Sequence, residues 1–338
     1  VIVGISEQDI KNLGHWPMYD QELALVIRRV KQQQPRAIGL DLYRDLPIEP
    51  GHQELVKVFK TTPNLIGIEK RGGAKDIPIA PPEALAELQQ VGSNDILRDV
   101  DNKIRRGFLY WTNAETGDYL ESLGLRLALI YLAQEGIQPQ AADEDSPNLK
   151  LGKAVFPVFE SHDGGYVGAE AAGYQMLMNF RGPAQTMTTV AMTDVMQGKV
   201  AADLFRDRIV LIGPTAESLK DFFPVPHTTT SDASEQMAGV EIQANIASQV
   251  LSSSLDGRSG IHFWSDPLEY GWIVLWAGAG AAIGWLVRSP RWAIAGMVVA
   301  VSSLLLACYL AFLGSWWIPV VPPTLALIAS AIALTGFA

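Results

Sequence analysis

The stretch YGWIVLWAGAGAAIGWLV, residues 270–287, opens the part of the sequence that decides the fold. Two further apolar stretches follow it closely, at residues 292–313 and 317–337. About 20 mostly apolar residues are needed to cross a hydrocarbon core of about 30 Å, so each stretch is expected to form a membrane-spanning helix. The sequence therefore predicts an all-α, three-helix transmembrane region over residues 270–338.

The charges in this region predict its orientation. Arg288 and Arg291 are its only charged residues, and both lie between the first two spans. Positive charges favour the cytoplasmic side, so we expect residues 1–269 to be extracytoplasmic and Ala338 to be cytoplasmic. Export of the outer part predicts either a signal peptide or a further transmembrane helix before Val1, and we favour the helix because Val1 already begins a predicted strand. The short third span predicts a helix that continues beyond Ala338.

Two glycines in the first span, Gly280 and Gly284, have the spacing that lets a second helix approach closely. That helix belongs either to the same three-helix bundle or to a second copy of the chain. We favour the same bundle, and keep the contact between copies as the alternative.

The residues before the spans are strongly acidic. The chain holds 26 Lys and Arg against 36 Asp and Glu, and without Arg288 and Arg291 the outer part has 24 bases, a formal charge of −12. This charge excludes nucleic acid as an expected partner. The single cysteine, Cys308, lies in the second span, so the outer part has no disulfide. That is more usual for a bacterial than for a secreted eukaryotic domain, and we expect the bacterial inner membrane.

Short apolar runs alternate with helical patterns before residue 258. The runs at residues 1–5, 37–41, 64–68 and 208–213 are typical of strands buried on both faces, and residues 6–9 are expected to form a loop. Such a βαβ order predicts an α/β fold with a mixed, mostly parallel sheet. We predict one domain over residues 1–258, which includes a hairpin of residues 154–159 and 166–169. A juxtamembrane linker is expected over residues 259–269.

Acidic residues follow three of the predicted strands. Asp9 comes after the first strand, Asp41 ends the second, and Asp221 follows the strand at residues 208–213. Ligands of parallel α/β sheets bind beyond the carboxyl ends of the strands, so these acids are candidates for a polar small-molecule site or a cation site. The alternative is that they cap helices and pair with arginines to fix loops. The candidate arginines are Arg105, Arg106 and Arg181.

Glu241 and Asn245 lie one turn apart on one face of the helix predicted at residues 241–252. They either contact a ligand or partner subunit, or serve as a helix-start carboxylate and a packing amide. Motifs of known chemistry are absent: there is no HExxH, no G-x-S-x-G and no Gly-rich phosphate loop with its lysine. We therefore predict no catalytic residue, no metal and no cofactor, and an enzyme on the outer surface is the least favoured hypothesis.

Several stretches run in a recognisable order across the soluble part: VIVGI (1–5), LGHWP (13–17), IGLD (38–41), DVDNKIRR (99–106), NFRG (179–182), DVMQG (194–198), RIVLIGP (208–214), Asp221 and MAGVEIQAN (237–245). In this order, and with three spans after them, they resemble the second type of CHASE domain, a cyclase/histidine-kinase-associated sensory extracellular domain. The sequence departs from the family pattern at three places. FFPVPHT follows Asp221 in place of a Thr-Pro stretch, Gln243 stands where the family has His, and Asn102-Lys103 replaces an Asp-Gly turn.

The resemblance implies a sensor that perceives an unknown small-molecule or protein stimulus. It also implies a homodimer in the lipid bilayer, with a cytoplasmic nucleotide cyclase or protein kinase after Ala338 as effector. The alternative hypothesis is a membrane-anchored interaction or scaffold subunit that docks on another membrane complex.

Overall fold

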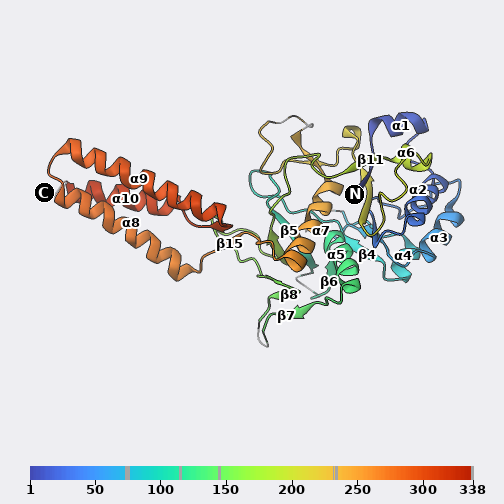
Figure 1. Cartoon of the computed structure of the whole chain (residues 1–338), viewed down its shortest axis with the longest axis horizontal. Coiled ribbons are helices and arrows are strands. Elements are labelled where there is room, and N and C mark those ends of the chain that lie inside the picture. The colour runs from blue at the N-terminus through green and yellow to red at the C-terminus, as the bar shows by residue number, and fades with distance from the viewer. Residues whose placement is uncertain (73–76, 114–115, 144–145, 231, 233–234, 336–338) are drawn as a thin grey trace. The chain divides into compact units, whose positions relative to one another are not determined.

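The computed structural model describes residues 1–338 except 73–76, 114–115, 144–145, 231, 233–234 and 336–338 (Figure 1). It divides into two compact units. The first holds residues 1–159 and 171–258, and the second holds residues 160–170 and 259–338. The segment 160–170 therefore belongs with the C-terminal helices, although it lies in the middle of the sequence.

A six-stranded sheet, with every strand pair parallel, forms the centre of the first unit. The four strands predicted from apolar runs are confirmed. Two edge strands of three residues each were not predicted, because so short a run shows no periodicity. In spatial order the strands are β11 (Thr189–Ala191), β1 (Ile2–Ile5), β12 (Ile209–Pro214), β2 (Ala37–Leu40), β3 (Leu65–Glu69) and β4 (Val91–Ser93).

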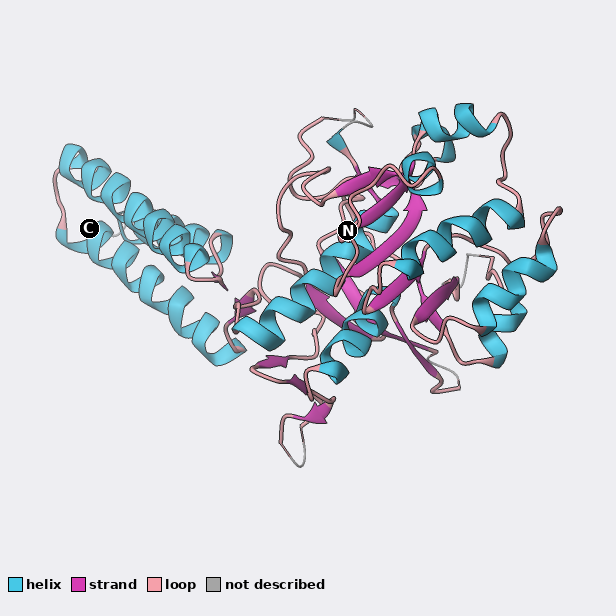
Figure 2. Cartoon of the chain, turned by 45° about the vertical axis from the view of Figure 1, so that its right-hand side comes forward, coloured by secondary structure: helices cyan, strands magenta, loops and turns pink. Residues whose placement is uncertain are grey.

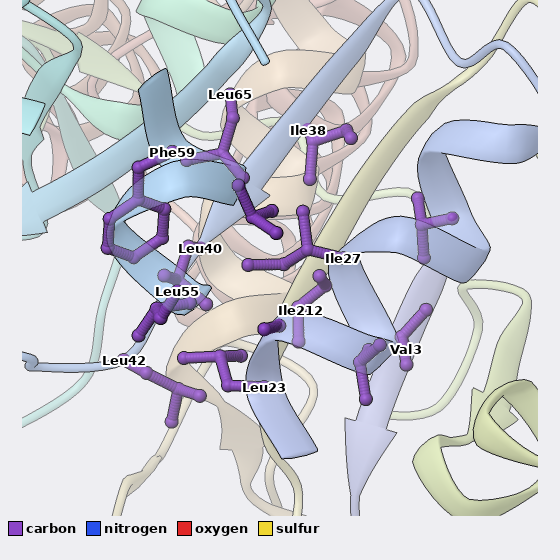
Figure 3. Packing of buried hydrophobic residues seen from close by; sticks show 14 of the residues in the cluster. Val3, Leu23, Ile27, Ile38, Leu40, Leu42, Leu55, Phe59, Leu65 and Ile212 are labelled. Atoms are coloured by element: carbon purple, nitrogen blue, oxygen red, sulfur yellow. The ribbon is translucent and has the colours of Figure 1, made fainter. Parts of the chain in front are cut away.

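Helices cover both faces of this sheet, because alternate residues of each strand point to opposite sides. On one face, Ile38, Leu40 and Ile212 pack against α2 (Asp20–Gln32) and α3 (His52–Lys60) (Figure 3). The helices α4 (Glu83–Glu87) and α6 (Met192–Met196) contribute to the same core. On the other face, Ala37 and Leu211 pack against α5 (Leu123–Gln134) and α7 (Gly239–Asp256).

A second core of buried side chains lies on the far side of α5 and α7. Figure 2 shows the helices of this unit in cyan and its strands in magenta. In the second core the two helices meet a small antiparallel sheet of β10 (Tyr174–Leu177), β5 (Arg106–Thr112) and β6 (Tyr119–Glu121). Because α5 and α7 are buried on both sides, α5 is apolar around most of its circumference, whereas α7 also buries polar side chains such as Glu241, Asn245 and Gln249. Further short pairs are β7 (Gln140–Ala141), β8 (Leu149–Leu151) and β9 (Ala154–Phe156), and β13 (Phe222–Phe223) with β14 (Met237–Ala238).

Two local predictions are wrong. Residues 6–9 form the start of α1 (Glu7–Leu13) rather than a loop, because Ser6 and Asp9 make a capping box that begins a helix directly after β1. The hairpin expected between residues 154–159 and 166–169 does not form, since β9 pairs with β8 instead. Gly164 and Gly165 lie against the Trp317 ring, and Tyr166 contacts that ring edge-on at 5.6 Å between centroids.

The second unit contains α8 (Asp266–Leu286), α9 (Pro290–Leu313) and α10 (Val321–Thr335). A parallel pair of two-residue strands, β15 (His262–Phe263) and β16 (Trp316–Trp317), accompanies them, so the unit is not purely helical. Within the described residues, α9 is the one helix that is both long and apolar enough to cross a membrane. α8 starts inside the predicted linker, because Ser265, Asp266 and Pro267 are strong helix-start residues.

Gly280 and Gly284 of α8 pack against α10 of the same chain. A Cβ atom at Gly280 would collide with the Leu327 carbonyl, and one at Gly284 would collide with that of Ala331. Ser330 Oγ of α10 also donates to the Ala277 carbonyl of α8, at 2.8 Å. The two glycines therefore serve packing within one bundle, as favoured from the sequence.

Replacing Gly280 by Leu is expected to separate α8 from α10 and to destabilise the helical unit by about 2 kcal/mol, as for other overpacked contacts. The measurement is the loss of helical circular dichroism when SDS is titrated into dodecylmaltoside micelles that hold the chain. Gly278→Leu is the matched control, because nothing lies within 4 Å of a Cβ atom there. Equal shifts for both variants would contradict the packing assigned to Gly280.

Candidate functional site

Asp41 lies at the carboxyl end of β2, where its N–H donates to the Ile212 carbonyl of β12 at 2.8 Å. The side chain is only 5% exposed. Its Oδ1 atom accepts from Asn94 Nδ2 at 3.3 Å, and Asn94 Oδ1 in turn accepts from the Tyr43 hydroxyl at 3.0 Å. Asn94 comes directly after β4, so this polar group joins the ends of two strands that are separated by β3.

Asp221 reaches the same place from the segment after β12. That segment passes through the short helix η1 (Glu217–Leu219) to Asp221, whose carbonyl accepts the N–H of Gly239 at 3.0 Å. A Cβ atom at Gly239 would overlap the Asp221 carboxylate, and one at Gly213 would lie 3.1 Å from the Cβ of Asp41. Glycine at a strand end and at a helix start thus leaves room for the two aspartates.

The two aspartates lie where the connections of the sheet change sides. After β2 the chain passes to α3 on one face, and after β12 it passes to α7 on the opposite face. Such a switch point is where parallel α/β sheets bind their ligands. The sequence placed Asp41 and Asp221 at this edge, and the structure brings them together.

Electrostatics at this edge raise the pKa of both carboxyl groups. Burial raises the pKa of Asp41 to about 7, and the nearby charge of Asp221 adds to the effect. Burial likewise raises the pKa of Asp221, against the opposing Gly239 N–H and the Arg98 charge. Buried carboxyl groups with a like-charged neighbour behave this way because desolvation penalises the ionised form.

Glu241 and Asn245 form a different group, on the buried face of α7. Glu241 accepts the backbone N–H groups of Gln185, at 3.0 Å, and of Met187, at 3.4 Å. Asn245 Oδ1 accepts the N–H of Arg181 at 3.0 Å. These contacts, with Gln249 one turn further on, fix the segment between β10 and β11 against α7. The packing alternative accounts for both side chains.

The candidate arginines do not surround Asp41. Arg181 donates from Nε to Ser248 Oγ on α7 at 2.8 Å. Arg105 and Arg106 both pair with Asp99, at 2.9 and 2.8 Å. The arginine whose charge acts on Asp221 is Arg98, which sequence reasoning missed.

Asp9 lies apart from these groups, in the first turn of α1, where it contacts Thr193 of α6. Its Oδ2 atom accepts from Ser6, and its Oδ1 atom accepts the N–H and hydroxyl of Thr193 at 2.8 and 2.7 Å. Burial opposes ionisation here, but the hydrogen bonds from Ser6 and Thr193 outweigh it and lower the pKa of Asp9. Asp9 is thus a cap that also joins two helices.

Replacing Asp9 by Ala is expected to destabilise the first unit by about 2 kcal/mol at neutral pH, because a cap and a buried acceptor are lost together. A lowered folded-state pKa means that this stabilisation is present above the unfolded-state value and is lost as pH falls through the folded-state value. Urea unfolding at pH 7 and at pH 3 measures both effects. A deficit that is equally large at both pH values would contradict the ionised cap.

Position 243, where the family has His, also has a structural explanation. Gln243 lies on α7 next to the start of α5, and its Oε1 atom accepts the N–H of Gly124 at 3.0 Å. An imidazole nitrogen is an acceptor of the same kind, so Gln supplies the interaction that this position requires. No group of three or more His, Cys, Asp or Glu able to hold a metal occurs in the described part of the chain.

Fold and site together define an α/β domain with a polar switch point, followed by a unit of apolar helices. The CHASE2 domain model matches residues 1–282, and the chain belongs to the CHASE2 family. CHASE2 domains are sensory extracellular domains of signalling proteins. Neither the curated proteins nor the solved structures contain a match to this chain.

Proposed function

We propose that this chain is the sensory and transmembrane region of a bacterial receptor in the inner membrane. It perceives an extracytoplasmic stimulus and transmits it to a cytoplasmic effector, a nucleotide cyclase or a protein kinase. Family membership and the apolar helix α9 support this proposal. The alternative is a membrane-anchored scaffold subunit.

The observation that carries the proposal is the position of Asp221 against Gly239, the first residue of α7. α7 ends at Asp256, and α8 begins at Asp266. Along the chain, α7 and the segment 257–265 therefore link the candidate site to the proposed membrane helices. A stimulus that favours one arrangement of the α7 start over another changes the population of the states that follow it.

In the membrane we propose three spans, formed by α8, α9 and α10, with the hairpin between α8 and α9 in the cytoplasm. α10 has 15 residues, about 22 Å of helix. A homodimer is part of the proposal, since cyclases and histidine kinases act as dimers.

Cysteine labelling tests this topology. Cys308→Ser removes the single cysteine, and Asp45→Cys or Ser289→Cys then places a thiol in the exposed loop after β2 or in the α8–α9 hairpin. A membrane-impermeant maleimide is expected to label position 45 in intact spheroplasts and position 289 only after permeabilisation. The opposite pattern would overturn the orientation.

Effector output tests the sensory role. In membranes that hold this chain with its proposed effector, Asp41→Asn is expected to change cyclase or kinase activity several-fold, because it replaces an ionisable group next to α7. The control is Asp45→Asn, an exposed residue in the same loop. Activity that neither Asp41→Asn nor Asp221→Asn alters would indicate the scaffold alternative.

A further inference from the structure

Two other buried carboxyl groups of this domain accept several hydrogen bonds each, whereas Asp41 does not. Glu241 accepts two backbone N–H groups, and Asp9 accepts hydrogen bonds from Ser6 and Thr193. Asp41 is buried to the same degree, yet it accepts one hydrogen bond, the 3.3 Å contact from Asn94. A buried carboxylate with so few donors lacks the interactions that normally maintain its charge.

In the described part of the chain, no ion pair balances the charge of the two aspartates. Within the described residues, neither Asp41 nor Asp221 forms an ion pair with a Lys, Arg or His side chain. Arg98 acts on Asp221 only from a distance. Its guanidinium group lies over the Phe223 ring, 4.9 Å from the centroid, and donates to Asn102 at 3.2 Å. The side chains around Asp41 and Asp221 therefore do not supply, through an ion pair, the positive charge that would balance two ionised carboxylates.

We propose that the Asp41–Asp221 pair binds a single proton, and that the domain senses extracytoplasmic acidity through it. This inference rests on the proposed sensory function and names its stimulus. Two carboxyl groups brought together away from water cannot both ionise at low cost, so they share a proton until the surrounding pH removes it. The pKa of about 7 that burial gives Asp41 places this loss near neutral pH.

The remaining titratable and charged groups around the pair do not replace the proton. Burial raises the pKa of Tyr43 to about 12, so its hydroxyl stays neutral. Asp95 adds negative charge, and its carboxylate already accepts from Ser93 and from the N–H groups of Arg71 and Gly72. Loss of the proton thus leaves two negative charges that only Arg98 partly offsets.

The start of α7 receives the effect of this loss. The Asp221 carboxylate fills the space beside Gly239, and the Asp221 carbonyl holds the Gly239 N–H. Val240, the next residue, packs against Gly213 at the end of β12, beside Asp41. Repulsion between the two carboxylates therefore acts on the first turn of α7, and we expect that turn to open more often once both are ionised.

Infrared difference spectroscopy of the full chain in nanodiscs tests proton binding directly. Between pH 6 and pH 8, a carboxylic acid C=O band equivalent to one proton per chain is expected to disappear. The band should be lost in Asp41→Asn and retained in Asp45→Asn. A spectrum without such a band overturns the inference, and so does a band that is unchanged in both variants. The inference is also overturned if adding a metal ion or an organic cation removes the band at constant pH, because the site would then bind that cation.

Hydrogen exchange tests the coupling. After correction for the intrinsic rate, protection of amides in the first turn of α7 is expected to fall about tenfold from pH 6 to pH 8, as for a local opening. In Asp41→Asn it should not change. Protection that is independent of pH in the wild-type chain overturns the switch. A proton that titrates and opens α7 without altering effector output would instead refute the proposed sensory function, so the two failures are distinguishable.

Discussion

Replacing Asp41 by Asn is expected to stabilise the first unit by about 4 kcal/mol above pH 7. The folded-state pKa of Asp41 is raised from 3.8 to about 7, and each unit is equivalent to about 1.4 kcal/mol. Above pH 7 the wild-type domain is destabilised by this amount, because the ionised Asp41 carboxylate remains buried beside Asp221. Asn has nearly the same shape and carries no charge, so the penalty disappears.

The sign of the pH dependence follows from proton linkage. Between about pH 4 and pH 7 the folded state holds the Asp41 proton and the unfolded state does not, so wild-type stability falls as pH rises through this range. Below about pH 4 both states are protonated, and the variant has no advantage. Pulse proteolysis in urea from pH 4 to pH 8.5 measures the two curves.

The exposed Asp45 provides the control for this experiment, since Asp45→Asn removes the same charge from the same loop without changing a buried group. Its curve is expected to follow that of the wild type. If the Asp41→Asn and wild-type curves were parallel over the whole range, the pKa of Asp41 would be the same in the folded and unfolded states, which would contradict the raised value.

The sequence predicts the centre of the first unit well, because buried parallel strands leave a local signal. Residues 37–41 and 208–213 are continuous apolar runs, and they become the adjacent strands β2 and β12. The edges of the sheet leave no such signal. β4 and β11 have three residues each, and their pairing with β3 and β1 depends on contacts distant in sequence.

The candidate site was predictable where it depends on the central strands, and it was not predictable where it depends on the edge strands. Asp41 and Asp221 follow the two clearest strands, so the rule for strand ends places both at one edge. Asn94 follows the unpredicted β4, and its contact with Asp41 was therefore not foreseen. Arg98 was missed because its position depends on how the segment before β5 folds back towards Phe223.

Replacing Glu241 by Ala is expected to destabilise the first unit by about 4 kcal/mol, the opposite of the Asp41 result. Hydrogen bonds to a charged group contribute about 1.5–3 kcal/mol each, and Glu241 accepts two, from the partly buried backbone N–H groups of Gln185 and Met187. The variant leaves the N–H groups of Gln185 and Met187 without an acceptor. It also removes a negative charge from the first turn of α7, where the helix dipole favours one.

Pulse proteolysis at pH 7 measures this loss, and Glu217→Ala is the control, because Glu217 is exposed and also lies at a helix start. Glu241→Gln is expected to recover about half of the stability, since its single amide oxygen serves one of the two N–H groups. The rates of amide hydrogen exchange at residues 185–187 should rise as the stability falls. A variant that remained stable and lost only its response to a stimulus would instead assign Glu241 to ligand recognition. The comparison with Asp41 distinguishes a structural from a sensory role. A buried carboxylate that accepts hydrogen bonds, such as Glu241, stabilises the fold. A buried carboxylate with few hydrogen-bond donors, such as Asp41, gains or loses a proton when the surrounding pH changes.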